Sequence, residues 1–219
     1  MASSGLELLW VSAPQLLTGA GRTLGISALA IVFSSVGGLF YGVLRSLGKR
    51  WLDVPLRVYL ELFRAIPVLV WLYLFFFGLP IFFGVSLPAF WCAVLVLSLW
   101  GASEIGEVVR GALRSIPRGQ REAGLAIGLG LGQLYGRVLL PQALKRLTPP
   151  VINVCTRLLK TSSLAVLIGV VDITKVGQQI IERTYESVLI YGFLFVFFFI
   201  VCYPLSAASR VLERRWNHA

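Results

Sequence analysis

Five long stretches of apolar residues constrain the fold of this chain more than any other feature. They cover about residues 23–47, 54–77, 87–113, 141–171 and 188–212. A helix needs roughly 20 mainly apolar residues to cross the hydrocarbon core of a bilayer. The fourth stretch is the least regular, because it is interrupted near Ser162 and Gly169. The pattern predicts an all-α integral membrane protein with five principal transmembrane helices.

The overall composition agrees with a membrane protein and argues against a soluble one. Of the 219 residues, 57% are hydrophobic and 14% are charged, and the mean hydropathy is +0.82. A soluble chain of this length has too little interior to hide so much apolar surface. The length favours a single transmembrane domain over residues 1–219, with an N-terminal interfacial segment at residues 1–22. The net charge of +10 does not indicate nucleic acid, because the arginines lie beside the apolar stretches.

The distribution of positive charge predicts which way the helices are oriented. Basic residues gather after the first stretch, after the third and after the last, whereas residues 78–91 contain no Lys or Arg. Cytoplasmic segments of membrane proteins carry the excess of Lys and Arg. We therefore expect the N-terminus outside and the C-terminus in the cytoplasm, which five crossings permit.

The long basic segment after the third stretch contains the most informative pattern. It is predicted to form a short helix over the sequence EAGLAIGL, and the glycines that follow it permit a turn. Pro141 is suited to start the next helix. A solvated linker does not need the apolar residues Leu125, Ile127, Leu129 and Leu131. Both a linker and a helix that docks in a groove of a partner remain open from these residues alone.

Residues 116–141 resemble the EAA loop of bacterial ABC-importer permeases. That signature reads E-A-A, three residues, G, nine residues, I, one residue, L-P, and its spacing is kept throughout. The matching residues are Glu122, Ala123, Gly124, Gly128, Val138, Leu140 and Pro141. Gly124 replaces alanine and Val138 replaces isoleucine. In that family this segment is the cytoplasmic coupling helix, which docks on the ATPase subunit.

The resemblance to the polar amino acid branch of these permeases extends over nearly the whole chain. Residues 59–67 resemble its aromatic-x-E-x-F-R-G-T-P stretch, Glu107 and Arg110 match its E-x-x-R-G, and residues 153–164 match its N…K-x-T-S-L. The resemblance implies a MetI-like fold in the bacterial cytoplasmic (inner) membrane. It also implies two ABC ATPase subunits, a second permease subunit (identical or homologous), and a periplasmic or surface solute-binding protein. ATP and Mg²⁺ would be bound by the ATPase, with no cofactor on this chain.

The sequence contains no residues suited to catalysis or metal binding. The glycine spacing of residues 119–124 continues into Leu125 and Ala126, so it lacks the Lys and Ser/Thr of a phosphate-binding loop. Together with this absence, the resemblance implies a non-catalytic permease subunit of an ATP-driven importer for a polar amino acid or related solute. The alternative is a self-contained channel or secondary transporter that uses its intramembrane charges. The absence of an internal repeat disfavours that alternative.

Charged residues inside the apolar stretches are candidates for function, because charge at membrane depth is costly. The spacing of three residues predicts two structural ion pairs, Glu61 with Arg64 and Glu107 with Arg110. Among the candidates for the solute path, Lys160 fits the family pattern, and it either joins the subunits or flanks the gate. Glu104 and Arg157 depart from that pattern.

Three roles for Glu104 are left open by the sequence. It binds the ammonium group of the solute, pairs with Arg157 across the bundle, or lies in the wall of a solvated cavity.

Overall fold

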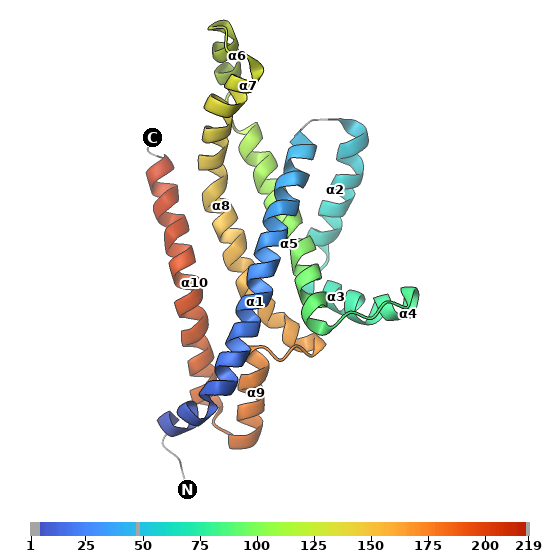
Figure 1. Cartoon of the computed structure of the whole chain (residues 1–219), viewed down its shortest axis with the longest axis vertical. Helices are drawn as coiled ribbons and strands as arrows, with labels where there is room; N and C mark the ends of the chain where they lie inside the picture. The colour runs from blue at the N-terminus through green and yellow to red at the C-terminus, as the bar shows by residue number, and fades with distance from the viewer. Residues whose placement is uncertain (1–4, 47–48, 218–219) are drawn as a thin grey trace.

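The computed structural model describes residues 5–46 and 49–217, and the part of the chain that it describes is helical (Figure 1). The long helices are α1 (Gly5–Ser46), α5 (Ala89–Arg114), α8 (Leu140–Thr161) and α10 (Ser187–Asn217). The shorter helices are α2 (Arg50–Ala65), α3 (Val68–Tyr73), α4 (Leu79–Phe83), α6 (Arg118–Ala126), α7 (Leu131–Gln133) and α9 (Ile173–Thr184). Two π-helical segments, Leu74–Gly78 and Leu134–Leu139, and a 3-10 helix, Ser162–Ile168, connect some of them.

Among the described residues, four helical stretches are long and apolar enough to cross a membrane, namely Glu7–Ser46, Ala89–Arg114, Gly136–Ile168 and Ser187–Trp216. A fifth candidate is broken, because Arg50–Ala65 and Val68–Phe83 meet at an angle of 105°. The all-α membrane fold with four to five spans is confirmed. The prediction of one unbroken helix over residues 54–77 is wrong.

Proline causes the break in that second span. Pro67 lacks a backbone N–H, and its ring pushes the preceding residue out of the helical region. Ile66 accordingly adopts an extended conformation with φ −99° and ψ 130°. α3, the π-helical segment and α4 then run sideways from the bundle (Figure 1), and they leave Ile81, Phe82 and Phe83 exposed.

Two other regions differ from the sequence-based expectation. The N-terminal residues do not form a separate interfacial helix within the described part, because α1 runs from Gly5 to Ser46 and includes Pro14. Helix α9 was not predicted, since it has only 12 residues and an amphipathic rather than apolar sequence. Asp172 caps it by accepting a hydrogen bond from the Lys175 N–H at 2.9 Å.

The core is organised around the contact between α1 and α5. A Cβ at Gly38 would lie 2.7 Å from Ile105 Cβ, and one at Gly42 would lie 2.5 Å from the Gly106 carbonyl oxygen. Small residues let helices approach closely in membranes, and Gly38 and Gly42 allow α1 to approach α5 in this way. α8 packs on α5 and also contacts α1, and α10 packs on α8.

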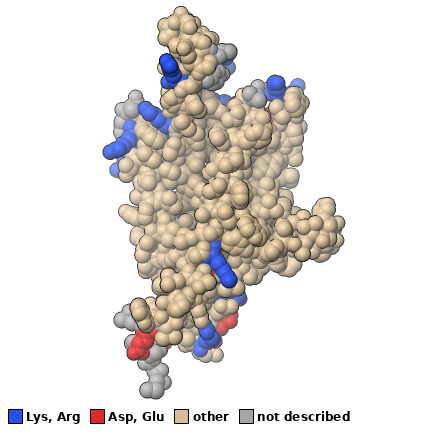
Figure 2. Space-filling model, in the orientation of Figure 1, with Lys and Arg blue, Asp and Glu red and all other residues tan. Residues whose placement is uncertain are grey.

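The charges lie toward the two ends of the molecule. On the face drawn in Figure 2, Lys and Arg side chains surround the end that holds α6 and the C-terminal part of α10, and the middle carries few charges. The beginning of α1 and helix α9 lie at the opposite end (Figure 1). The first residues of α1 and the last residues of α10 therefore lie on opposite sides of the apolar band.

Candidate functional site

Helix α6 protrudes at one end of the molecule and is held by a defined turn. Its last residues are followed by Gly128, which has φ +81°. The Leu129 N–H donates to the Gly124 carbonyl at 3.1 Å, and the Gly128 N–H donates to the Leu125 carbonyl at 3.0 Å. These two bonds and the left-handed residue form a Schellman motif, in which glycine is favoured. Nothing lies within 4 Å of a Cβ built at Gly128, so within this chain the backbone conformation accounts for this glycine.

The surface of α6 divides into a buried contact and an exposed face. Gly124 is buried, and a Cβ there would lie 2.5 Å from the Cδ1 of Leu134, which is fully buried. Glu122 and Ala123 are exposed. Leu125 and Ile127 are 44% and 77% exposed, although both are large and apolar. The segment over residues 116–141, which we name the docking loop, thus presents apolar side chains that the described part of the chain does not cover.

The docking loop is continuous with α8 and is tied to α5. Leu140 and Pro141 lie in the first turn of α8, as the helix-starting role of Pro141 predicted, although π-helical residues precede it. Leu140 is 51% exposed. Arg146 of α8 donates hydrogen bonds to the carbonyl and the hydroxyl of Ser115, just after α5. The loop therefore begins and ends at helices that are bonded to each other.

Glu104 of α5 lies between two arginines from different helices. Its Oε2 accepts a hydrogen bond from Arg157 Nη2 of α8 at 2.5 Å, and its Oε1 lies 3.4 Å from Arg64 Nε of α2. The Glu104 side chain is 14% exposed, whereas those of Arg64 and Arg157 are 49% and 53% exposed. Arg157 also lies over the ring of Trp100, 5.7 Å from its centroid. We name Arg64, Glu104 and Arg157 the carboxylate site, and its formal charge is +1.

The partner of Arg64 corrects the first predicted ion pair. The spacing of Glu61 and Arg64 allows a pair within α2, but Arg64 turns to Glu104, and Glu61 is exposed and forms no ion pair with the described residues. The cross-bundle partner is less exposed than Glu61, so the charge interaction is stronger there. Of the roles left open for Glu104, the pairing with Arg157 is present in this structure.

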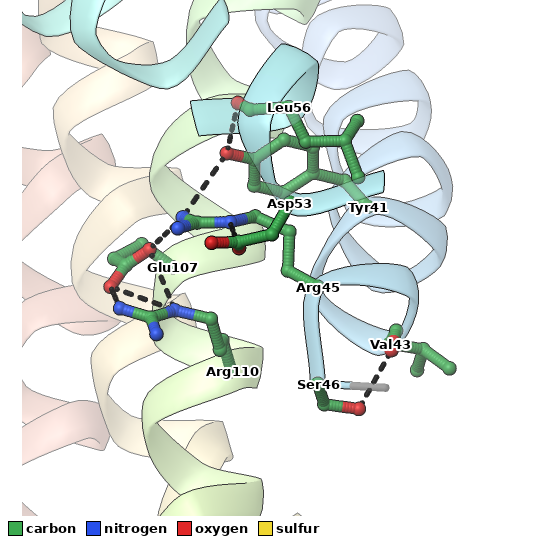
Figure 3. Close-up of polar contacts among 8 residues, drawn as sticks. All are labelled: Tyr41, Val43, Arg45, Ser46, Asp53, Leu56, Glu107 and Arg110. Atoms are coloured by element: carbon green, nitrogen blue, oxygen red, sulfur yellow. Dashed lines mark hydrogen bonds and ion pairs between the residues drawn. The ribbon is translucent and has the colours of Figure 1, made fainter. Parts of the chain in front are cut away.

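Glu107 pairs with Arg110 as its spacing predicted, but it also accepts a bond that was not foreseen (Figure 3). Arg45 Nη1 of α1 lies 2.7 Å from Glu107 Oε2, and Arg45 Nε lies 2.9 Å from Asp53 Oδ1 of α2. The sequence offers one indication of the contact between Arg45 and Asp53, because Asp53 is the only acidic residue between Arg45 and Arg57.

Lys160 lies one turn after Arg157 but faces another environment. It lines a cavity of about 500 Å³ together with residues of α10, among them Phe199 and Cys202. Arg157, in contrast, contacts α5. The structure therefore brings Glu104 and Arg157 together and leaves Lys160 apart from their ion pair.

Comparison with known proteins places this geometry among membrane transport subunits. The model of the family described as "Binding-protein-dependent transport system inner membrane component" matches residues 34–218. The glutamine transport system permease protein GlnP of Escherichia coli (strain K12) is 36% identical over 208 residues, which cover 94% of this chain and 95% of that protein.

Two solved structures share the fold. A chain of an amino acid ABC transporter crystallised with histidines superposes with a TM-score of 0.87 at 27% identity, covering 98% of this chain and 100% of that one. A chain of the MetNI methionine ABC transporter in an inward-facing conformation gives a TM-score of 0.73 at 26% identity, covering 91% and 95%. The expected MetI-like arrangement is confirmed.

Proposed function

Because this chain belongs to the family of binding-protein-dependent transport system inner membrane components, we propose that its docking loop binds the ATPase and its carboxylate site binds the solute. The chain is the permease subunit of an ABC amino acid importer and a multi-pass protein of the bacterial inner membrane. It is the non-catalytic membrane subunit, and its family implies ATPase and binding-protein partners. The proposal concerns how the residues of this subunit perform that task.

The proposed docking helix is α6. The exposed Leu125 of α6 and Ile127 directly after this helix offer an apolar contact of the kind that a groove on a partner covers. Glu122, in the same helix, offers a carboxylate to a cation on the ATPase, which would carry ATP and Mg²⁺. Glu122→Lys is expected to abolish assembly or solute-stimulated ATP hydrolysis while membrane insertion is preserved. Normal coupled activity in this variant would remove the support for docking through Glu122.

The observation that carries the solute proposal is a shielded carboxylate held between two half-exposed guanidinium groups. An α-amino acid has both a carboxylate and an ammonium group, and the relative GlnP is by its name a glutamine permease. Arg64 and Arg157 retain donors that can bind the solute carboxylate, and Glu104 can accept from its ammonium. In the solute-free state Glu104 offsets one of the two arginine charges, which limits the cost of charge at membrane depth.

Transport would follow alternating access with a second permease subunit. A binding protein delivers the solute from outside, and closure of the ATPase pair moves the docking loops so that the path opens alternately to the two sides. The clustering of Lys and Arg around α6 and the end of α10 supports a cytoplasmic position for that end. The N-terminus and α9 would then face outward, toward the binding protein. Lys160, in the cavity beside α10, would contact the second permease or the gate.

Solute binding to the assembled complex tests the carboxylate site. Glu104→Gln and Arg157→Gln should each weaken solute binding about ten- to a hundredfold, because each removes one charge-assisted hydrogen bond worth roughly 1.5–3 kcal/mol. Basal ATP hydrolysis should remain. Glu61→Gln is the matched control, since Glu61 is an exposed glutamate of the neighbouring α2 without an ion pair among the described residues.

The double variant separates the two roles of the ion pair. If Glu104 and Arg157 only neutralise each other and do not bind solute, replacing both should recover much of the solute affinity that either single replacement loses. If they bind solute, the double variant should be at least as weak as either single one. Wild-type affinity in both single variants, or recovery in the double variant, would contradict a solute site here.

A further inference from the structure

Arg45 is a buried charge at the end of α1 that joins three helices (Figure 3). It is only 3% exposed, yet it donates to Asp53 of α2 and to Glu107 of α5 at 2.9 and 2.7 Å. An arginine has five donors in a fixed planar arrangement, so it can hold two carboxylates in a defined geometry. The guanidinium of Arg45 therefore fixes the positions of α1, α2 and α5 relative to one another.

Tyr41, one turn before Arg45, adds a second link between the same helices. Its hydroxyl donates to the Leu56 carbonyl of α2 at 2.8 Å and lies 3.4 Å from Arg45 Nη1. Its ring occupies the space at Gly106 of α5, where any side chain would overlap it. Tyr41, Arg45, Asp53 and Glu107, which we name the helix clamp, thus combine hydrogen bonds with close packing.

The clamp acts on α5 between the docking loop and the carboxylate site. Glu107 lies three residues after Glu104, which is about 4.5 Å along a helix. In the other direction α5 ends at Arg114, and three residues separate it from α6. A displacement of α6 that is transmitted along α5 to Glu104 therefore also moves Glu107, which the helix clamp holds to α1 and α2. The hydrogen bonds of Arg45 resist sliding of α5 against α1 and α2, because each displaced donor or acceptor would be left without a partner.

We propose that Arg45 is a positioning residue for transport: by clamping Glu107 to α1 and α2, it makes these three helices one body that transmits movement of the docking loop to the carboxylate site. The inference rests on the proposed function, since it assumes that the docking loop receives the movement and that Glu104 lies on the solute path. It adds a residue that contacts neither the ATPase surface nor the solute. Arg45 would act only through Glu107 and Asp53.

Arg110 provides a matched control within the same cluster. It donates to the same carboxylate of Glu107, but it comes from α5 itself and therefore adds no link between helices. Arg45→Met and Arg110→Met each remove one positive charge from Glu107 and substitute the same side chain. The two variants differ in whether α5 loses its attachment to α1 and α2.

The experiment uses the complete transporter, with its ATPase and binding protein, reconstituted in proteoliposomes. ATP hydrolysis is measured with and without binding protein loaded with each polar amino acid in turn, beginning with glutamine, together with the affinity for the amino acid that stimulates it. We expect Arg45→Met to lower the stimulation of hydrolysis at least about fivefold, the lower end of typical coupling between sites, with solute affinity and basal hydrolysis unchanged. Arg110→Met should keep the wild-type stimulation.

A further variant separates coupling from folding. If Arg45→Met assembles poorly, Arg45→Met/Glu107→Gln should restore assembly, because it removes the carboxylate left with fewer partners. It should not restore stimulation, because the link remains broken. Wild-type stimulation in either Arg45 variant, or equal losses in the Arg45 and Arg110 variants, would overturn the inference. Absence of stimulation in the wild-type complex would instead refute the proposed function, and the inference would fall with it.

Discussion

Replacing Gly128 with alanine should weaken binding to the ATPase through the backbone alone. Gly128 has φ +81°, and a Cβ there meets nothing within 4 Å. The cost of the methyl group is therefore that of a left-handed L-residue, about 1–2 kcal/mol. If the docking-competent turn is destabilised by that amount, its population and the apparent affinity for the ATPase fall about five- to thirtyfold.

The assay is the equilibrium affinity of the purified permease, in lipid nanodiscs, for the ATPase subunit. Gly128→Asn is the first control, because asparagine tolerates the left-handed conformation and should lose much less affinity than alanine. Gly119→Ala is the second control, since Gly119 lies in α6, has helical backbone and also has nothing within 4 Å of its Cβ. Wild-type affinity in Gly128→Ala would refute the backbone argument. Equal losses with alanine and asparagine would show instead that the partner approaches Gly128 too closely for any side chain.

Three more predictions concern stability and orientation. Gly42→Leu should lower the thermal midpoint of the detergent-solubilised protein, because its Cβ would lie 2.5 Å from the Gly106 carbonyl oxygen and overpacking costs about 1–3 kcal/mol or more; an unchanged midpoint would contradict the α1–α5 packing. Burial raises the pKa of Asp172, so its contribution to stability is fully present below its unfolded pKa, near 3.9, and is lost as pH rises through the raised folded pKa. Asp172→Asn keeps the capping oxygen and should reduce the fall of the thermal midpoint as the pH rises above about 4; an unchanged dependence of the midpoint on pH would exclude Asp172 as its source. Single cysteines in a background lacking the native ones should react with a membrane-impermeant reagent in intact cells at position 84 and not at position 120, and the reverse would overturn the orientation.

The transmembrane helices were predictable where hydrophobicity and backbone preference agree. The third and fifth apolar stretches correspond to α5 and α10, and the interruption of the fourth appears as a 3-10 helix followed by Gly169 with φ +88°. The prediction of one unbroken helix over the second stretch was wrong because hydropathy does not report a bend, although Pro67 lies in the middle of this stretch. Helix α9 was missed for a different reason: it is short and amphipathic, so it does not form a long apolar stretch in the sequence.

The charged sites were only partly predictable, because sequence spacing reports neighbours on one helix and not partners on others. It found Glu107 with Arg110, three residues apart on α5. It paired Arg64 with Glu61 and gave no sign that Glu104 is the partner of Arg64. The pairing with Glu104 depends on how α2 packs against α5, which places Glu104 near Arg64 across 40 residues of sequence.

The sequence by itself determined that this chain is a membrane protein, where its coupling signature lies and which residues place charge at membrane depth. These properties depend on composition and local order, since each apolar stretch is long enough for a bilayer and each motif is read along the chain. The tertiary structure decided which charges meet. It set Glu104 between Arg64 and Arg157, and it buried Arg45 between Asp53 and Glu107. The physical reason is that a charge removed from water takes its partner from whichever helix packing brings within hydrogen-bonding distance.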